Sequence, residues 1–170
     1  MMSGFILVLL LTACGENNEE EIPEVTSETI TTLPEERPED FDFSLWYGIT
    51  GANEINTYEG TYTKDLAEGG DVTTELALTN EEMNVIYEQM RSVDILNTPR
   101  YVSTTTCVHP YDENHLTMTV NGEVIEREWI HAMCGEPEER LAELVEIIHQ
   151  EMIEPRSEYQ NLPEATGGYD

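Results

Sequence analysis

The chain has 170 residues and a formal net charge of −29, because 36 Asp and Glu side chains face only seven Lys and Arg. This length predicts one domain, alone or with tails. So negative a surface repels phosphate groups, which excludes nucleic acid as a partner and argues against docking through a basic patch on anionic lipid. The apolar fraction of 39% is below the usual ~45–50%, so we expect part of the chain to lie outside the folded core.

The first apolar run covers residues 5–11 and reads FILVLLL. It is too short to span a bilayer, which takes about 20 residues, but it suits the apolar region of a secretory signal peptide. The residues before it lack the Lys or Arg of export signals, and a start codon upstream would explain that. The alternative is a buried strand, for which the next thirty or so residues offer no partner.

The run ends in Leu11-Thr12-Ala13-Cys14, which resembles the lipobox of bacterial lipoproteins. In this resemblance Leu11 is the aliphatic position, Ala13 precedes the cleavage, and Cys14 receives the lipid. The resemblance implies a signal peptide over 1–13 and a lipid on Cys14 that anchors the protein to the extracytoplasmic face of the cell membrane. Two acyl chains on that residue are enough for stable anchoring. The arrangement also resembles the small lipoproteins of bacilli.

The segment after the cysteine is acidic, with prolines and threonines and no apolar period. Such a composition buries too little surface to offset its ordering entropy, so residues 14–40 are predicted to be a disordered tether. The folded domain is expected over 41–154, followed by a polar, flexible tail over 155–170.

The domain begins with a strand pattern. Residues 41–50 alternate apolar and polar side chains, and residues 55–64 form a second predicted strand with Gly60 as a bulge. A Gly-Gly-Asp turn leads to a third strand over 72–78. The three strands predict an antiparallel meander.

Two helices and a hairpin follow. Thr79 and Glu82 form a capping box that begins the first helix, and Pro137 stands in the first turn of the second. Between them, Asn121-Gly122 is typical of a type I′ turn joining strands over 115–120 and 123–131. The fold class is therefore α+β, an antiparallel sheet of about five strands in the order βββ-α-ββ-α with two helices on one face. The predicted buried helix residues are Met83, Ile86, Tyr87, Met90 and Val93 in the first helix and Leu141, Leu144, Val145, Ile148 and Met152 in the second.

The hairpin register brings Cys107 and Cys134 to the same open end. Outside the cytoplasm this favours a disulfide between them. The alternative is a metal site or redox sensor that adds His109 and His131 to the two sulfurs, although these spacings differ from those of zinc fingers and ribbons. Two free thiols are the third interpretation.

The alternation of the first strand directs Trp46 away from the apolar face. We expect Tyr58 and Tyr62 on the same side, where these aromatics form a partner surface if the helices cover only the other face. The competing interpretation is that a loop or the C-terminal tail covers them. The remaining histidines, His115 and His149, are expected to be solvated.

The sequence contains no Ser-His-Asp elbow, phosphate loop, EF-hand spacing or HExxH motif. We therefore expect no enzymatic activity and no cofactor. The favoured function is a non-enzymatic binding or envelope-accessory lipoprotein, whose partners are the membrane, through the lipid on Cys14, and an envelope protein or ligand. The alternative function is metal binding or redox sensing through the two cysteines and two histidines.

Overall fold

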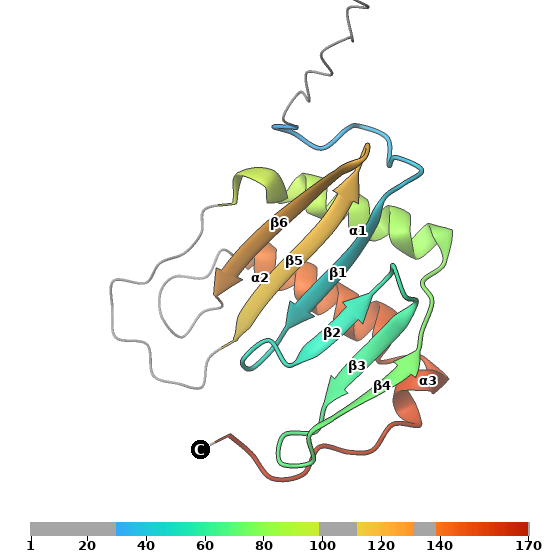
Figure 1. Cartoon of the computed structure of the whole chain (residues 1–170), viewed down its shortest axis with the longest axis vertical. Helices are drawn as coiled ribbons and strands as arrows, with labels where there is room; N and C mark the ends of the chain where they lie inside the picture. Colours follow the sequence, from blue (N-terminus) through green and yellow to red (C-terminus); the bar gives the residue numbers. More distant parts are fainter. Residues whose placement is uncertain (1–29, 99–111, 131–138, 170) are drawn as a thin grey trace, which may run out of the picture.

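The computed structural model describes residues 30–98, 112–130 and 139–169. In them, six antiparallel strands form one sheet and the helices pack on one of its faces (Figure 1), which confirms the α+β prediction. The elements are β1 (Asp42–Tyr47), β2 (Asn53–Asn56), β3 (Thr61–Asp65), β4 (Asp71–Glu75), α1 (Asn80–Ser92), a 3-10 turn (Ile95–Asn97), β5 (Glu113–Val120), β6 (Glu123–Ile130), α2 (Glu139–Glu146), a π-helical stretch (Ile147–Ile153) and α3 (Ser157–Gln160).

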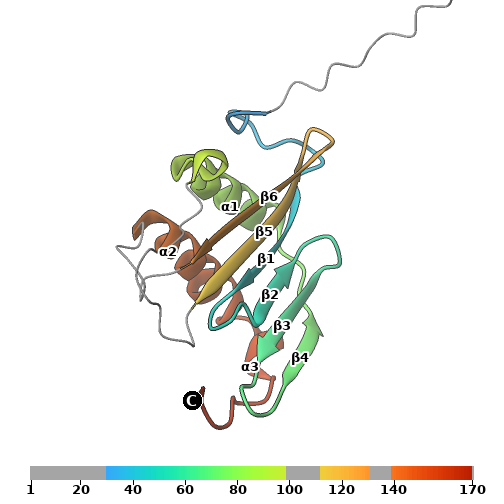
Figure 2. The same cartoon turned by 60° about the vertical axis from the view of Figure 1, so that its left-hand side comes forward.

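The strands lie across the sheet in the order β4-β3-β2-β1-β5-β6. The first strand of the chain is thus an inner strand, because the β5–β6 hairpin pairs with the edge of β1 that β2 leaves free. Figures 1 and 2 show α1 and α2 on the same side of the sheet. We call the side that carries the helices the covered face and the other side the open face.

The segment predicted as one strand over residues 55–64 is two strands, β2 and β3. The chain reverses between them, and Gly60 has a φ of 65° there, so it is a turn residue and not a bulge. Thr57 holds the start of the turn, since its hydroxyl accepts from the Phe43 N–H at 2.7 Å and its own N–H donates to the Phe43 carbonyl at 2.8 Å. The sheet therefore has six strands instead of about five.

The first helix begins at its predicted cap. Thr79 accepts from the Glu82 N–H at 3.3 Å, and Glu82 accepts from the Thr79 N–H at 2.7 Å. All five residues of the predicted stripe are buried, and Tyr87 packs edge-on against Phe41 with ring centroids 4.9 Å apart. The α-helix ends at Ser92, and the 3-10 turn carries the chain onward to Asn97.

The predicted hairpin is confirmed. Asn121 and Gly122 have φ values of 51° and 79°, as a type I′ turn requires, and Val120 pairs with Glu123. The turn also has an outside partner, because the Asp40 carboxylate accepts from the N–H of Asn121 at 3.0 Å and of Gly122 at 2.6 Å.

The second predicted helix is described from Glu139 and changes character along its length. Its last seven residues form a π-helix, whose wider turns let the consecutive residues Met152 and Ile153 both be buried with Ile148. It ends at Ile153, before Pro155 as predicted, and its C-cap Glu154 donates its N–H to the His149 carbonyl at 2.9 Å.

The predicted boundary between tether and domain was wrong. Ile30 and Leu33 pack against the core, and the Tyr87 hydroxyl donates to the Pro34 carbonyl at 2.9 Å. With the Asp40 contact to the hairpin turn, these interactions extend the domain to residue 30 at least. This packing could not be predicted from the sequence, because Ile30 and Leu33 are isolated apolar residues in a polar stretch that shows neither helical nor strand periodicity.

The predicted flexible tail also packs on the domain. Arg156 donates to the Ala77 carbonyl at 3.0 Å and pairs with Glu82, which joins the start of the tail to the cap of α1. Farther along, the Thr166 N–H donates to the Leu66 carbonyl at 3.2 Å. The C-terminal segment thus runs along the turn between β3 and β4.

Replacing Asp40 with alanine tests whether residues 30–40 belong to the domain. The Asp40→Ala variant loses two hydrogen bonds to the hairpin turn and should be destabilised by about 1 kcal/mol. Urea unfolding of this variant, wild type and a Glu39→Ala control measures the difference. Equal unfolding midpoints for the Asp40 and Glu39 variants would contradict the packing described here.

Candidate functional site

The open face is acidic from one edge of the sheet to the other. The ladder pairs Glu54 with Trp46, Trp46 with His115 and His115 with Glu128, so these side chains form one row across four strands. Aspartate and glutamate occupy open-face positions on every strand. They are Asp42, Glu54, Asp65, Asp71, Glu75, Glu113, Glu126 and Glu128.

The positive charges lie on the other side. Of the seven Lys and Arg residues, all but Arg100 fall in the described ranges. Each of these six contacts the helical layer or the segments that pack on it. For example, Arg127 donates to the Leu96 carbonyl at 2.8 Å, and Arg37 donates to the Asn84 carboxamide at 2.6 Å. Among the described residues the open face therefore carries carboxylates and a single imidazole, His115, but no Lys or Arg.

A groove crosses the open face beside Trp46. We call it the Trp46 groove; its volume is about 470 Å³ and it is lined by Trp46, Ala52, Thr63, Asp65, Ala67, Gly70, Asp71 and Thr73. Thr63 forms part of its floor, with its hydroxyl 2.8 Å from that of Thr73. Trp46 stands above this floor and is 41% exposed.

The two carboxylates of the groove differ in their partners. Asp65 accepts from the Ala67 N–H at 2.8 Å and from the Tyr169 hydroxyl. Burial, the hydrogen bond to Asp65 and the charge of that carboxylate raise the pKa of Tyr169 to about 12, which keeps the phenol a donor. Asp71 is exposed, and its carboxylate makes no hydrogen bond or ion pair within the described part of the chain. In the groove, the Asp65 carboxylate is therefore occupied by hydrogen bonds within the domain, whereas the Asp71 carboxylate is available to a ligand.

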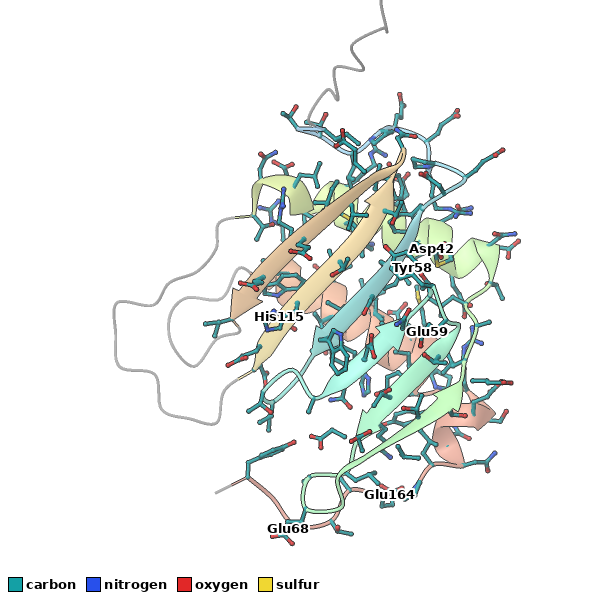
Figure 3. All side chains as sticks on the ribbon, in the orientation of Figure 1. Asp42, Tyr58, Glu59, Glu68, His115 and Glu164 are labelled. Atoms are coloured by element: carbon teal, nitrogen blue, oxygen red, sulfur yellow. The ribbon has the colours of Figure 1, made fainter. Side chains whose placement is uncertain are left out.

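The other aromatic residues predicted for a partner surface lie in different places. Tyr58 is 46% exposed on the open face, where its hydroxyl lies 2.8 Å from that of Thr119; Figure 3 places it beside Asp42. Tyr62 was predicted wrongly, since it is fully buried on the covered face. The reason is the turn after β2, which pairs Tyr62 with Ile55 and so directs both into the core.

Tyr62 belongs to a polar cluster between the covered face and the last helices. The Tyr47 hydroxyl lies 2.7 Å from His149 Nδ1 and 3.3 Å from the Tyr62 hydroxyl, and Tyr62 donates to Asn53 Oδ1 at 3.3 Å. On its other side, His149 Nε2 lies 3.3 Å from a Glu154 carboxylate oxygen. These contacts form one chain of polar groups that joins the sheet to the π-helix.

The charges at the cluster follow from its burial. Burial raises the pKa of Tyr47 and Tyr62, which keeps both phenols protonated. Burial also lowers the pKa of His149, although the neighbouring Glu154 carboxylate opposes this effect. A neutral His149 that donates from Nε2 to Glu154 accepts at Nδ1 from Tyr47, so each proton has an acceptor. The cluster is therefore suited to holding the π-helical stretch in place against the sheet.

A lysine also lies in this layer. Lys64 is only 8% exposed, and its ammonium lies 4.7 Å from the centre of the Tyr159 ring. Neither this contact nor the role of His149 was predicted: His149 was expected to be solvated and Tyr159 to lie in a loose tail. The alternation of β3, with Tyr62 and Lys64 on the same side, would have been the only signal.

The predicted cysteine and histidine site lies outside the described residues, as does Cys14. β5 and β6 are paired as far as Glu113 and Ile130, as the predicted register requires. The roles of Cys107, His109, His131 and Cys134 remain predictions. In the described ranges, no three His, Cys, Asp or Glu side chains are grouped so as to hold a metal ion, and no helix is long and apolar enough to cross a membrane.

Comparison with known proteins gives no relative: no family model, no curated protein and no solved structure matches the chain.

The buried imidazole predicts an acid-sensitive stability. Because burial holds the folded-state pKa of His149 below its ordinary value of 6.5, the unfolded chain binds a proton more readily. The contribution is fully present above pH 6.5 and is lost as the pH falls through the folded-state pKa. Urea unfolding at about pH 7.5 and about pH 5.5 should show a larger loss for wild type than for His149→Gln. The same pH response in both proteins would contradict this assignment.

Proposed function

We propose that the protein is a lipid-anchored, extracytoplasmic binding module without enzymatic activity, and that the open face of its sheet is the binding surface. The anchor rests on the resemblance of Leu11-Thr12-Ala13-Cys14 to a lipobox. The lipid on Cys14 holds the domain on the outer side of the cell membrane.

The observation that carries the binding role is the one-sided charge distribution around an exposed tryptophan. Trp46 stands exposed on the inner strand β1 and lines a groove of about 470 Å³ together with two carboxylates. Tryptophan is among the residues most enriched where proteins bind their partners. The surrounding carboxylates keep the face hydrated and select the partner by charge.

We assign a structural role to the buried cluster of Tyr47, Tyr62 and His149. Tyr47 is 4% exposed and its hydroxyl is engaged by His149 and Tyr62. A raised pKa makes its phenol a poor proton donor. The open face is therefore the better candidate for contact with a partner.

Replacing the lipidated residue tests the anchor. In a Gram-positive host, the wild-type chain should be recovered with membranes, require detergent for release and carry diacylglycerol on Cys14. The Cys14→Ser variant should remain uncleaved and unlipidated, whereas a matched Cys107→Ser variant should behave as wild type. Fractionation and intact mass measure both properties. Identical mass shifts and fractionation for Cys14→Ser and wild type would refute the anchor.

The two remaining cysteines distinguish this proposal from the metal or redox alternative. We expect a disulfide between Cys107 and Cys134, since their segments leave the sheet at the same end of the hairpin. Intact mass after alkylation without reductant should show both residues unmodified and the loss of two hydrogens. Two alkylated thiols on a chain that retains zinc would favour the alternative.

A further inference from the structure

We propose that the open face binds a basic, extended segment of another protein, with one positive side chain of that segment over Trp46 in the Trp46 groove. This inference rests on the proposed function, because it names the class of partner for the same surface.

The charge pattern selects a cationic partner. Every strand contributes a carboxylate to the open face, and the described Lys and Arg side chains contact the helical side instead. A field of one sign over one surface raises the local concentration of oppositely charged partners and speeds their association. An acidic or phosphorylated partner would be repelled by the same field.

The groove provides a site for a lysine or arginine side chain. An indole face attracts an ammonium or guanidinium group, and here Trp46 lines the same groove as Asp65 and Asp71. The Asp71 carboxylate makes no hydrogen bond or ion pair with another described residue, so it can pair with such a group. The hydroxyls of Thr63 and Thr73, 2.8 Å apart, belong to residues that line the same groove.

The dimensions favour an extended segment over a small cation. Neighbouring strands lie about 4.8 Å apart, so the carboxylates from β4 to β6 span roughly 24 Å. A small cation bound in the groove would leave most of the open-face carboxylates without a positively charged partner. An extended chain of about seven residues covers this distance at about 3.3 Å per residue, and its alternate side chains point toward the sheet.

Binding of a defined peptide tests this inference. The probe is a fluorescein-labelled octapeptide of alternating arginine and serine, with citrulline replacing arginine in its neutral counterpart. Fluorescence anisotropy with the full-length protein in detergent gives the dissociation constant. The arginine peptide should bind and the citrulline peptide should bind at least about tenfold more weakly. Equal binding of the two peptides, or no binding of either, would overturn the proposal.

Variants separate a specific surface from general attraction to an acidic protein. Asp71→Asn with Glu75→Gln removes two charges from the open face, and Glu81→Gln with Glu143→Gln removes two from exposed helix positions. The first pair should weaken binding about fivefold, the second less than about twofold. Trp46→Ala should weaken binding about tenfold, and Trp46→Phe less. Equal losses for the two charge pairs, or an unchanged affinity of Trp46→Ala, would overturn the assignment to this face.

The lipid anchor and the basic partner can fail independently of each other. If Cys14 is lipidated but the arginine peptide does not bind, the anchor stands and the class of partner is wrong. If the peptide binds as expected but the chain carries no lipid, the binding surface stands and the anchor is wrong. Displacement of the peptide by millimolar calcium, but not by the same ionic strength of sodium chloride, would overturn the basic segment in favour of a cation site.

Discussion

The structure depends on the strict alternation of side chains along a six-stranded antiparallel sheet that is covered on one face only. Alternation assigns each strand residue to the core or to the open face, and a shift of one residue would exchange the two sets. Phe43, Leu45 and Tyr47 lie on the covered side, whereas Asp42, Ser44 and Trp46 lie on the open side. Folding of the core thereby also sorts the charges.

The sorting explains how so acidic a domain folds. Carboxylates on the open face remain hydrated, and the arginines stabilise the helical side through carbonyl groups and helix ends. Arg156 joins the end of the π-helix, the Ala77 carbonyl and the cap of α1, and Arg127 donates to the Leu96 carbonyl beyond the end of α1. A hydrogen bond from a charged donor stabilises more than a neutral one. The basic residues in the described ranges therefore serve the packing of the helices, and none of them lies on the open face.

The elements governed by local patterns could be predicted from the sequence. The capping box of α1 and the type I′ turn at Asn121-Gly122 follow from a few adjacent residues, and both are confirmed. The division of one predicted strand into β2 and β3 could not be predicted, because it depends on contacts of Thr57 with β1.

The same reason explains what was missed at the candidate site. Trp46 was correctly placed on the open face because only the alternation of its own strand was needed. Tyr62 was misplaced because its orientation depends on the register after that turn. The contact of His149 with Tyr47 joins residues 102 positions apart. It also depends on a π-helix for which the sequence gives no recognisable signal.

The arrangement of the two ends of the domain bears on how a lipid-anchored surface would be presented. The Ile30 N–H contacts the Glu123 carboxylate, and Asp40 binds the adjacent hairpin turn, so the chain enters the domain at that end of the sheet. The turn between Asp65 and Asp71, which borders the Trp46 groove, lies toward the opposite end of the long axis (Figure 1).

This separation would matter for the proposed basic partner, because anionic lipid attracts basic segments as well. The field of the membrane decays over a Debye length of about 8 Å at physiological salt. The eight residues of β5 alone extend roughly 26 Å at about 3.3 Å per residue. If the proposed lipid on Cys14 anchors the protein, a domain oriented with residue 30 toward the membrane would hold the groove several Debye lengths from the lipid. In that orientation the open-face carboxylates would attract the proposed basic segment beyond the reach of the membrane's own field.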